Sequence, residues 1–458
     1  MALERSHRRC CVLLLLGLGL RGLAWAQEAP EAAAPEEPAG LRPRLDFGLE
    51  ARANFRHSED NRFPVPFPFR PDQLPPGQTR GFEETVNPGS HFELSDVTLF
   101  VDATWGDGLA AHGKIDFIDL YDRNPTSTDK KIDVDEAWVR FGVEPDPATL
   151  APRGGVYLKI GKFPKFERQD DRHLESYGLV STAFNRFEDT GVELGAHLGR
   201  HLYLKLSATG GNPVFMRDPN ALAGDNGTPA LLRPNPDPAL HSGVVILYDA
   251  EVEDLDVDGK LEAGAGLGWR WADAEGRNGL DALAWGYKRK LAKTVELEGT
   301  FYGGDLDLLN GPNDATPLAI KNDDKREVGG NVWLYLGGFS FFSQYVDQEL
   351  AGLPRTGIEG EIAWHFDLPL VWAVGDRQLL TSIAPAVRYS KLDNKFRNHP
   401  LTPSPSFAWD WEKLDAGLRV GIFSGVDLTV EYADNRFILG SGARRENNEG
   451  LLTLRWRI

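Results

Sequence analysis

Hydrophobic and polar residues alternate along most of the chain, and this alternation predicts extended strands. In the closing stretch 451–458, LLTLRWRI, leucine, tryptophan or isoleucine stands at every second position, with threonine or arginine between them. Successive side chains of a strand point to opposite faces, so the stretch predicts one apolar and one polar face. The pattern recurs near residues 45–55, 261–271, 357–368 and 413–422. Each repeat has about the 9–11 residues that a tilted membrane strand needs.

The period-two rule predicts about 18 strands. The segments near 242, 280 and 378 fit the rule least well, so 16 strands is the alternative, and the number is even in both cases. The predicted strands begin near residues 45, 91, 109, 132, 155, 188, 202, 242, 259, 280, 294, 326, 339, 357, 378, 413, 426 and 450.

The connections between these strands alternate in length. Tight turns follow even-numbered strands, at 106–108, 200–201, 337–338 and 423–425. Long polar connections follow odd-numbered strands, at 56–90, 165–187, 211–241, 304–325, 392–412 and 435–449. Short periplasmic turns and long outer loops are typical of outer-membrane barrels. The pattern predicts an all-β fold, a transmembrane antiparallel up-and-down β-barrel; a secreted soluble β-protein is the alternative.

The first residues predict export. A basic stretch, MALERSHRR, precedes an apolar stretch, CCVLLLLGLGLRGLA, and the small residues Ala24 and Ala26 end it. Residues 1–26 are therefore expected to be a cleaved signal peptide, 27–44 a flexible lead-in rich in Ala, Pro and Glu, and 45–458 the barrel. Both cysteines lie in the signal, and no later apolar run is long enough for a membrane helix. A mature chain that spans a membrane must then do so as a closed barrel.

Charge and composition narrow the class of partner. The chain has 50 Lys and Arg against 68 Asp and Glu, a net charge of −18. Nucleic acid requires a basic surface, so no nucleic-acid partner is expected. The 49 glycines and the 10% of aromatic residues fit a sheet protein. The expected surroundings are outer-membrane lipid.

One region resembles a known family. The stretch Val156 to Gly195 has a strand that ends in Gly161-Lys162-Phe163, then an irregular loop, then Asp189-Thr190-Gly191-Val192-Glu193-Leu194-Gly195. Together with Asp135-Glu136-Ala137-Trp138-Val139, it resembles the phosphate-selective porin O and P family over roughly residues 91–210. The order Phe163-Pro164-Lys165-Phe166 departs from the usual motif of that family, and the family barrel is 16-stranded.

The resemblance implies a homotrimeric outer-membrane channel for small hydrophilic solutes or ions, with a loop folded inward as the constriction. A preference for anions such as phosphate is implied by the resemblance alone. The alternative is a barrel with a closed lumen that acts through its surface loops as a binding or adhesion protein.

Two sets of charged residues are candidates for the pore. The loop after the Val156 strand contributes Lys162, Lys165, Arg168, Arg172 and Arg186; a solvated surface loop of mixed charge is the alternative for it. Alternation places many further charges on the lumen face, among them Lys159, Arg270, Lys288, Arg419, Arg455, Arg457, Glu359 and Glu361. Because both signs line the lumen, alternation does not predict selectivity.

No motif in the chain predicts chemistry. Asp254 to Gly259 matches the opening of a calcium loop, but Ala265 stands where the bidentate glutamate belongs. The histidines lack the HExxH spacing, and no serine lies in a nucleophile elbow. We therefore expect no enzyme activity, no metal and no cofactor.

Overall fold

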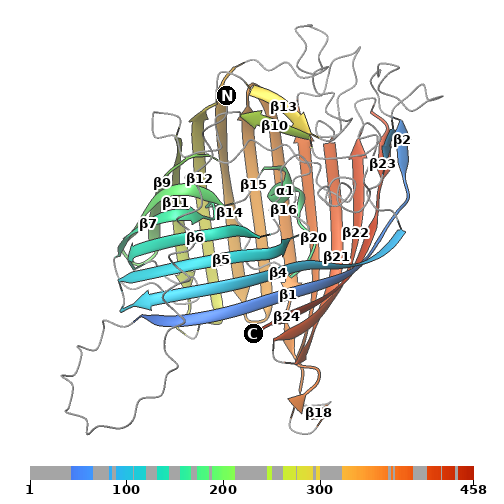
Figure 1. Cartoon of the computed structure of the whole chain (residues 1–458), viewed down its shortest axis with the longest axis horizontal. Coiled ribbons are helices and arrows are strands. Elements are labelled where there is room, and N and C mark those ends of the chain that lie inside the picture. Colours follow the sequence, from blue (N-terminus) through green and yellow to red (C-terminus); the bar gives the residue numbers. More distant parts are fainter. Residues whose placement is uncertain are drawn as a thin grey trace, which may run out of the picture. The chain divides into compact units, whose positions relative to one another are not determined.

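The computed structural model contains a closed antiparallel β-barrel (Figure 1). The structure describes residues 43–64, 82–84, 89–106, 108–119, 132–143, 155–166, 173–184, 188–211, 245–249, 261–274, 276–291, 295–299, 322–369, 373–374, 377–395, 410–423, 425–438 and 442–458. The predicted signal peptide, the lead-in up to residue 42 and the calcium-like stretch 254–259 lie outside these residues.

Sixteen strands form the ring, and each pairs with its neighbours in the order of the chain. They are β1 (Arg44–Ser58), β4 (Gly89–Trp105), β5 (Leu109–Asp119), β6 (Asp133–Gly142), β7 (Val156–Phe163), β8 (Asp189–Leu198), β9 (Leu202–Thr209), β11 (Glu262–Ala272), β12 (Asn278–Lys290), β14 (Asp324–Leu336), β15 (Phe339–Leu350), β16 (Leu353–Trp364), β20 (Ser382–Asn394), β21 (Asp410–Phe423), β22 (Val426–Ile438) and β24 (Glu449–Arg457).

The first and last strands close the ring. β1 pairs with β24 in antiparallel register, from Glu50 opposite Arg457 to Ser58 opposite Glu449. Two backbone hydrogen bonds of 3.0 Å between Leu49 and Ile458 continue the pairing. The amphipathic closing stretch thus completes the barrel, because no strand edge stays open in lipid.

Sixteen is the lower of the two predicted strand numbers. Two predicted strands, those near 242 and 294, form a separate two-stranded sheet, β10 (Val245–Asp249) with β13 (Val295–Gly299). Both belong to connections between ring strands, so their five-residue alternation looks like that of a ring strand in sequence. Two strands are lost from the count together, so the four predicted tight turns still follow even-numbered strands.

The ring sheet also contains two short strands that are not separate members of the ring. β17 (Phe366–Asp367) pairs with β20, as β16 does, and β23 (Arg444–Glu446) pairs with β22, as β24 does. Two short hairpins lie outside the ring, β2 (Arg62–Pro64) with β3 (Phe82–Glu84) and β18 (Ala373–Val374) with β19 (Arg377–Gln378).

One connection departs from the predicted alternation of lengths. β15 and β16 are joined by Ala351 and Gly352 alone, although β15 is the eleventh strand of the ring. Both residues have positive φ, 53° and 84°, as the type I′ form of a two-residue hairpin turn requires. We call the end with the four predicted tight turns the turn end and the opposite end the loop end.

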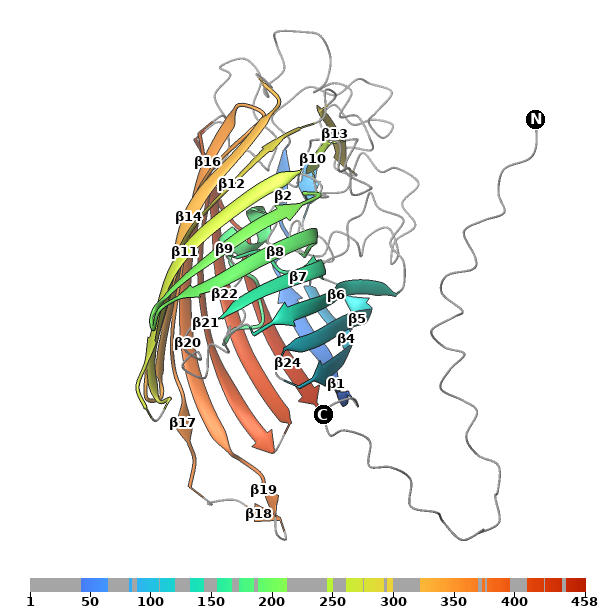
Figure 2. The same ribbon diagram turned by 90° about the vertical axis from the view of Figure 1, so that its left-hand side faces the viewer.

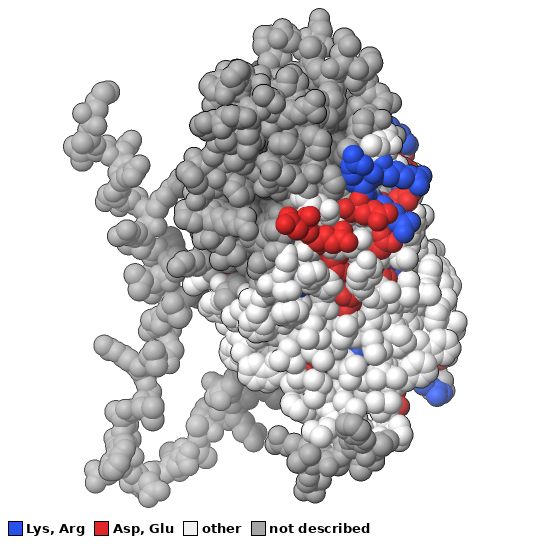
Figure 3. Space-filling model, turned by 90° about the vertical axis from the view of Figure 1, so that its right-hand side faces the viewer, with Lys and Arg blue, Asp and Glu red and all other residues white. Residues whose placement is uncertain are grey.

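The two faces of the barrel have opposite chemistry. On the outer face Val430 and Leu454 are 50% and 45% exposed, whereas Arg388 and Asp415 on the inner face are fully buried. Charged side chains gather towards one end of the face in Figure 3, and the broad surface beside them carries few. A soluble protein buries its apolar side chains, so this reversed arrangement is that of a barrel in lipid.

Aromatic side chains mark the turn end of the outer face. Trp269, Trp364 and Trp456 lie near the ends of β11, β16 and β24 and are 40 to 48% exposed. Amphipathic rings at one level of a barrel are typical of the membrane–water interface. Among the described residues, no helix combines the length and the apolar character needed to cross a membrane.

Candidate functional site

Part of the connection between β7 and β8 lies inside the barrel. Its described parts are residues 164–166 and 173–184, which include the short helix α1 (Leu179–Ala183). Figures 1 and 2 show α1 within the ring of strands. Leu174, Leu179 and Val180 have no exposed surface. We call residues 173–184 the inward segment.

Two separate parts of the barrel wall hold this connection. The Phe166 ring lies 5.4 Å from the ring of Tyr287 on β12, and the Phe166 N–H donates a 3.0 Å hydrogen bond to the Tyr287 hydroxyl. Leu174 instead packs with Ala363 on β16 and Ala386 on β20. The connection therefore contacts the wall at β12 and again at β16 to β20.

Wall carboxylates accept hydrogen bonds from the backbone of the inward segment. His173 N–H donates to Glu361 at 2.9 Å, Glu175 N–H to Glu431 at 2.8 Å, and Val180 N–H to Glu359 at 3.1 Å. These backbone groups take no part in the barrel sheet, and buried polar groups require partners. The carboxylates at these positions thus fix the path of the segment.

Close packing at Gly178 fixes the same path. A Cβ atom built on Gly178 would lie 1.8 Å from a carboxylate oxygen of Glu359. No side chain fits there unless Glu359 or the backbone moves. The residue before this glycine is held as well, because Lys413 Nζ donates to the Tyr177 carbonyl at 2.8 Å.

A buried arginine joins the segment to β20, β21 and β22. The Arg388 guanidinium donates to Asp415 at 2.8 and 3.0 Å and to the Ser176 hydroxyl at 2.7 Å. Ser176 also donates to Glu431, which lies 3.9 Å from Arg388. A charge without exposed surface needs such partners, because burial of an unpaired ion is costly.

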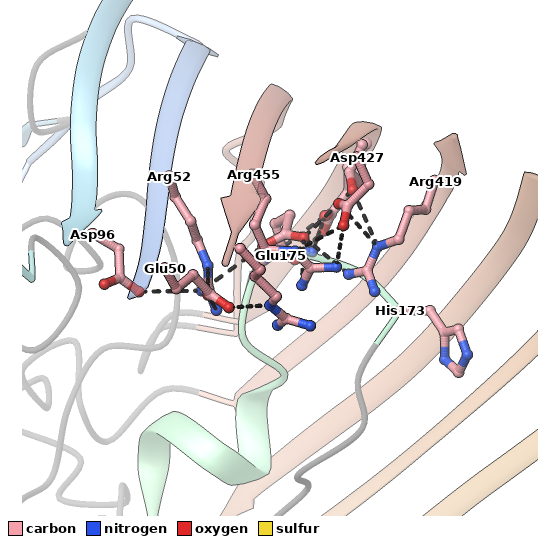
Figure 4. Close-up of polar contacts among 12 residues, drawn as sticks. Glu50, Arg52, Asp96, His173, Glu175, Arg419, Asp427 and Arg455 are labelled. Atoms are coloured by element: carbon pink, nitrogen blue, oxygen red, sulfur yellow. Dashed lines mark hydrogen bonds and ion pairs between the residues drawn. The ribbon is translucent and has the colours of Figure 1, made fainter. Parts of the chain in front are cut away.

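Glu175 lies at the centre of a second charged cluster (Figure 4). Its carboxylate accepts a 2.9 Å hydrogen bond from Arg419 and lies 3.6 Å from Arg455 and 3.8 Å from Arg52. These arginines come from β21, β24 and β1, so the cluster spans the seam where the ring closes. Asp427 on β22 also lies 2.7 Å from Arg455 and 3.8 Å from Arg419.

A third cluster holds the start of the connection. Lys165 forms an ion pair with Glu262, whose other oxygen lies 2.6 Å from Lys325 on β14. Glu262 is fully buried at the loop end of β11. The predicted candidate Lys165 is therefore paired with the wall at the start of the connection.

The structure brings several predicted candidates together. Glu359, Glu361, Arg419 and Arg455 all meet the inward segment, as described above. Arg457 is half exposed and forms an ion pair with Glu50, beside the cluster around Glu175.

Other candidates line separate parts of the inner wall. The Lys159 ammonium lies 3.7 Å from Glu193 and 4.9 Å from the centre of the Trp138 ring. Arg270 donates to Asp281 at 2.7 Å. Arg168, Arg172 and Arg186 lie outside the described residues.

The prediction for Lys162 is wrong. β7 continues to Phe163, so alternation places Lys162 on the outer face, directly across from Ala137 and Thr190, which are exposed. Its ammonium donates to the Val134 carbonyl at 2.8 Å. The sequence interpretation ended the strand too early and counted Lys162 with the loop.

The predicted candidates omit Glu175, Arg388, Asp415 and Glu431. Alternation places the last three on the inner face. It does not indicate which of the many inner charges the connection would meet. That contact joins residues about 210 to 260 positions apart in the chain, which no local pattern predicts.

One group of carboxylates has a spacing that a metal ion would accept. Ligand atoms of Asp135, Glu136 and Glu188 lie within 4.8 Å of one another. Lys114 already forms an ion pair with Asp135. The ammonium group of Lys114 therefore already provides, beside Asp135, the positive charge that a metal cation would bring.

Solved outer-membrane proteins share this fold. The outer membrane channel DcaP of Acinetobacter baumannii aligns with a TM-score of 0.50 and 11% identity, over 93% of this chain and 100% of that chain. OprB of Pseudomonas putida gives a TM-score of 0.51 and 9% identity, over 90% and 94%. No protein-family model and no curated protein matches the sequence. At such identities the likeness concerns the fold alone.

The reversed polarity, the closed ring and this likeness define the class: the chain is an outer-membrane β-barrel with the fold of a porin. The narrower resemblance to the phosphate-selective porin O and P family stays a prediction.

Proposed function

We propose that the protein is a porin through which small hydrophilic solutes or ions diffuse passively across the outer membrane. The observation that carries the proposal is a barrel with a charged inner face and an inward segment held against that face. Diffusion pores require a hydrated wall, which charged side chains of both signs supply. No bond is made or broken in such a function.

The inward segment serves as the constriction in this proposal. Its backbone is held by Glu359, Glu361, Glu431 and Lys413, so its position is defined without sheet pairing. Charges at a narrow point act strongly on a passing ion, because low-dielectric walls focus their field. The residues that border the segment would then set which ions pass.

The preferred ion does not follow from the charges alone. Arginines and carboxylates are paired around the inward segment, so neither sign dominates there. An anion preference, phosphate included, rests on the family resemblance, and so does the homotrimer.

A second function is a barrel whose lumen is closed and whose loops bind a partner. The observation in its favour is the apolar packing of the inward segment. Leu179, Val180, Ala183 and Phe184 join Val346, Leu392, Trp411 and Phe437 of the wall in one buried cluster. Apolar packing of this kind excludes water from that side of the lumen.

Conductance in planar lipid bilayers distinguishes the two functions. We expect purified protein to give discrete current steps that scale with salt concentration. A reversal potential in a salt gradient then gives the sign of the preferred ion, and added phosphate tests the narrower preference. Inserted protein that gives no steps would refute the porin and favour the binding barrel.

A further inference from the structure

Glu175 occupies a site built from three arginines. Arg419 donates to its carboxylate at 2.9 Å, Arg455 and Arg52 lie within 3.8 Å, and Thr429 donates at 3.4 Å (Figure 4). The Glu175 side chain is 4% exposed. All four partners belong to ring strands, whereas Glu175 belongs to a connection. The site is thus part of the wall and its occupant is not.

The occupant balances the charge of the site. The wall supplies Arg52, Arg419, Arg455 and Arg457, and these pair with the wall carboxylates Glu50, Asp96 and Asp427. Glu175 is the fourth carboxylate, so these members of the cluster, counted among the described residues, carry four charges of each sign. Without it one positive charge would remain, and guanidinium groups bind a planar carboxylate through paired N–H donors. A solute with a single carboxylate would restore the same balance.

The backbone beside Glu175 is held independently of this side chain. Glu175 N–H and Ser176 N–H both donate to Glu431, at 2.8 and 3.2 Å, and Lys413 holds the Tyr177 carbonyl. None of these contacts uses the Glu175 carboxylate. The side chain can therefore leave the arginines by a rotamer change while the inward segment keeps its place.

We propose that the arginine cluster is a binding site for small monocarboxylate solutes and that Glu175 is its internal competitor. A solute carboxylate takes the site by displacing the Glu175 side chain, with the inward segment in place. The inference rests on the proposed porin function, since the solute reaches the site through the lumen.

The test compares wild type with Glu175→Gln, which keeps the size of the side chain and removes its charge. Currents carried by acetate, phosphate or chloride are measured in planar bilayers over a range of concentrations. We expect the half-saturating acetate concentration to fall at least about tenfold in Glu175→Gln, the effect of losing a charge-assisted competitor of about 1.4 kcal/mol. Glu446→Gln, on the exposed strand β23, removes a carboxylate away from the site and should leave the value unchanged.

Each outcome decides the inference. Conducting channels with equal acetate saturation in wild type and Glu175→Gln would overturn it and leave the porin function standing. A larger fall for phosphate than for acetate would overturn the monocarboxylate class. Should Glu175→Gln fail to fold, judged by heat-modifiable gel mobility, Glu175→Asp withdraws the carboxylate by one methylene group and should give a smaller fall in the same direction.

A second measurement covers the case in which wild type inserts but does not conduct. That result refutes the porin function, and the site is then tested by thermal unfolding of detergent-solubilised protein. A bound ligand stabilises the folded state by RT ln(1 + L/Kd), where L is the free ligand concentration, so at one ligand concentration the stabilisation rises with the affinity. Acetate should then raise the melting temperature of Glu175→Gln more than that of wild type, and equal shifts would overturn the inference.

Discussion

A charge placed on either side of one strand tests the orientation of the whole barrel. Leu206 on β9 faces outward, is 40% exposed, and lies directly across from Leu194 on β8 and Ala265 on β11. Its neighbour Ser207 faces inward, across from Glu193. The two substitutions Leu206→Arg and Ser207→Arg add the same side chain one residue apart and on opposite faces.

The expected difference follows from the surroundings of each face. An arginine on the lipid face of a barrel costs about 2–4 kcal/mol near the membrane midplane. This cost lowers the ratio of folded to unfolded protein by roughly 30- to 700-fold, at 1.4 kcal/mol for each factor of ten. At Ser207 the new charge would lie near Glu193, which already lies 3.8 Å from Lys205, and the lipid cost does not apply.

Urea titration of barrels folded into lipid vesicles measures this difference, with heat-modifiable gel mobility as the readout of folding. We expect Leu206→Arg to lose about 2–4 kcal/mol and Ser207→Arg to stay within about 1 kcal/mol of wild type. Equal losses in both variants would refute the assignment of faces, and with it the membrane barrel.

Three further predictions concern the constriction, the charge of the lumen and maturation. Gly178→Ala should displace the inward segment and change the single-channel conductance. Gly360→Ala should not, because a Cβ there would meet its nearest atom at an ordinary 3.5 Å; equal conductance in both variants would contradict the constriction. Arg457→Gln should shift the reversal potential towards cation preference. The shift should be larger at about 0.01 M salt than at about 1 M, because the screening length falls from about 30 Å to about 3 Å between these concentrations. A shift independent of salt would contradict this prediction. N-terminal sequencing of outer-membrane fractions should begin at or near Gln27, and a chain that retains Met1 would exclude the predicted cleavage.

The alternation of side chains predicted most of the barrel, because each ring strand must place apolar groups in lipid and polar groups inside. It correctly assigned Leu454 to the outer face and Arg455 to the inner face. It failed at Lys288, which is exposed on the outer face although it was assigned to the lumen. On that strand Trp285 and Tyr287 face inward, because the Phe166 connection covers them there. Where a connection packs on the inner face, that face is apolar. The rule that polar residues face the lumen therefore assigns the residues of this strand to the wrong faces.

The site itself was less accessible to sequence reasoning than the fold. The family resemblance implied an inward loop, and the structure places residues 173–184 inside the ring. The partners of that segment come from strands far along the chain, and a charged residue in a sequence does not reveal which opposite charge it will meet. The sequence pattern named Arg419 and Arg455 as inner residues but offered no reason to join them with Glu175.

The seam between β1 and β24 also sets an order of events in the making of the barrel. Two of the three arginines around Glu175, Arg52 and Arg455, come from these two strands, which are the farthest apart in the chain. They become neighbours only when the ring closes. The cluster is therefore completed by closure, and a barrel stalled before closure would hold Glu175 by Arg419 and Arg455 without Arg52, because β24 already pairs with β22. Contact of the Glu175 carboxylate with all three arginines therefore indicates that the barrel has closed.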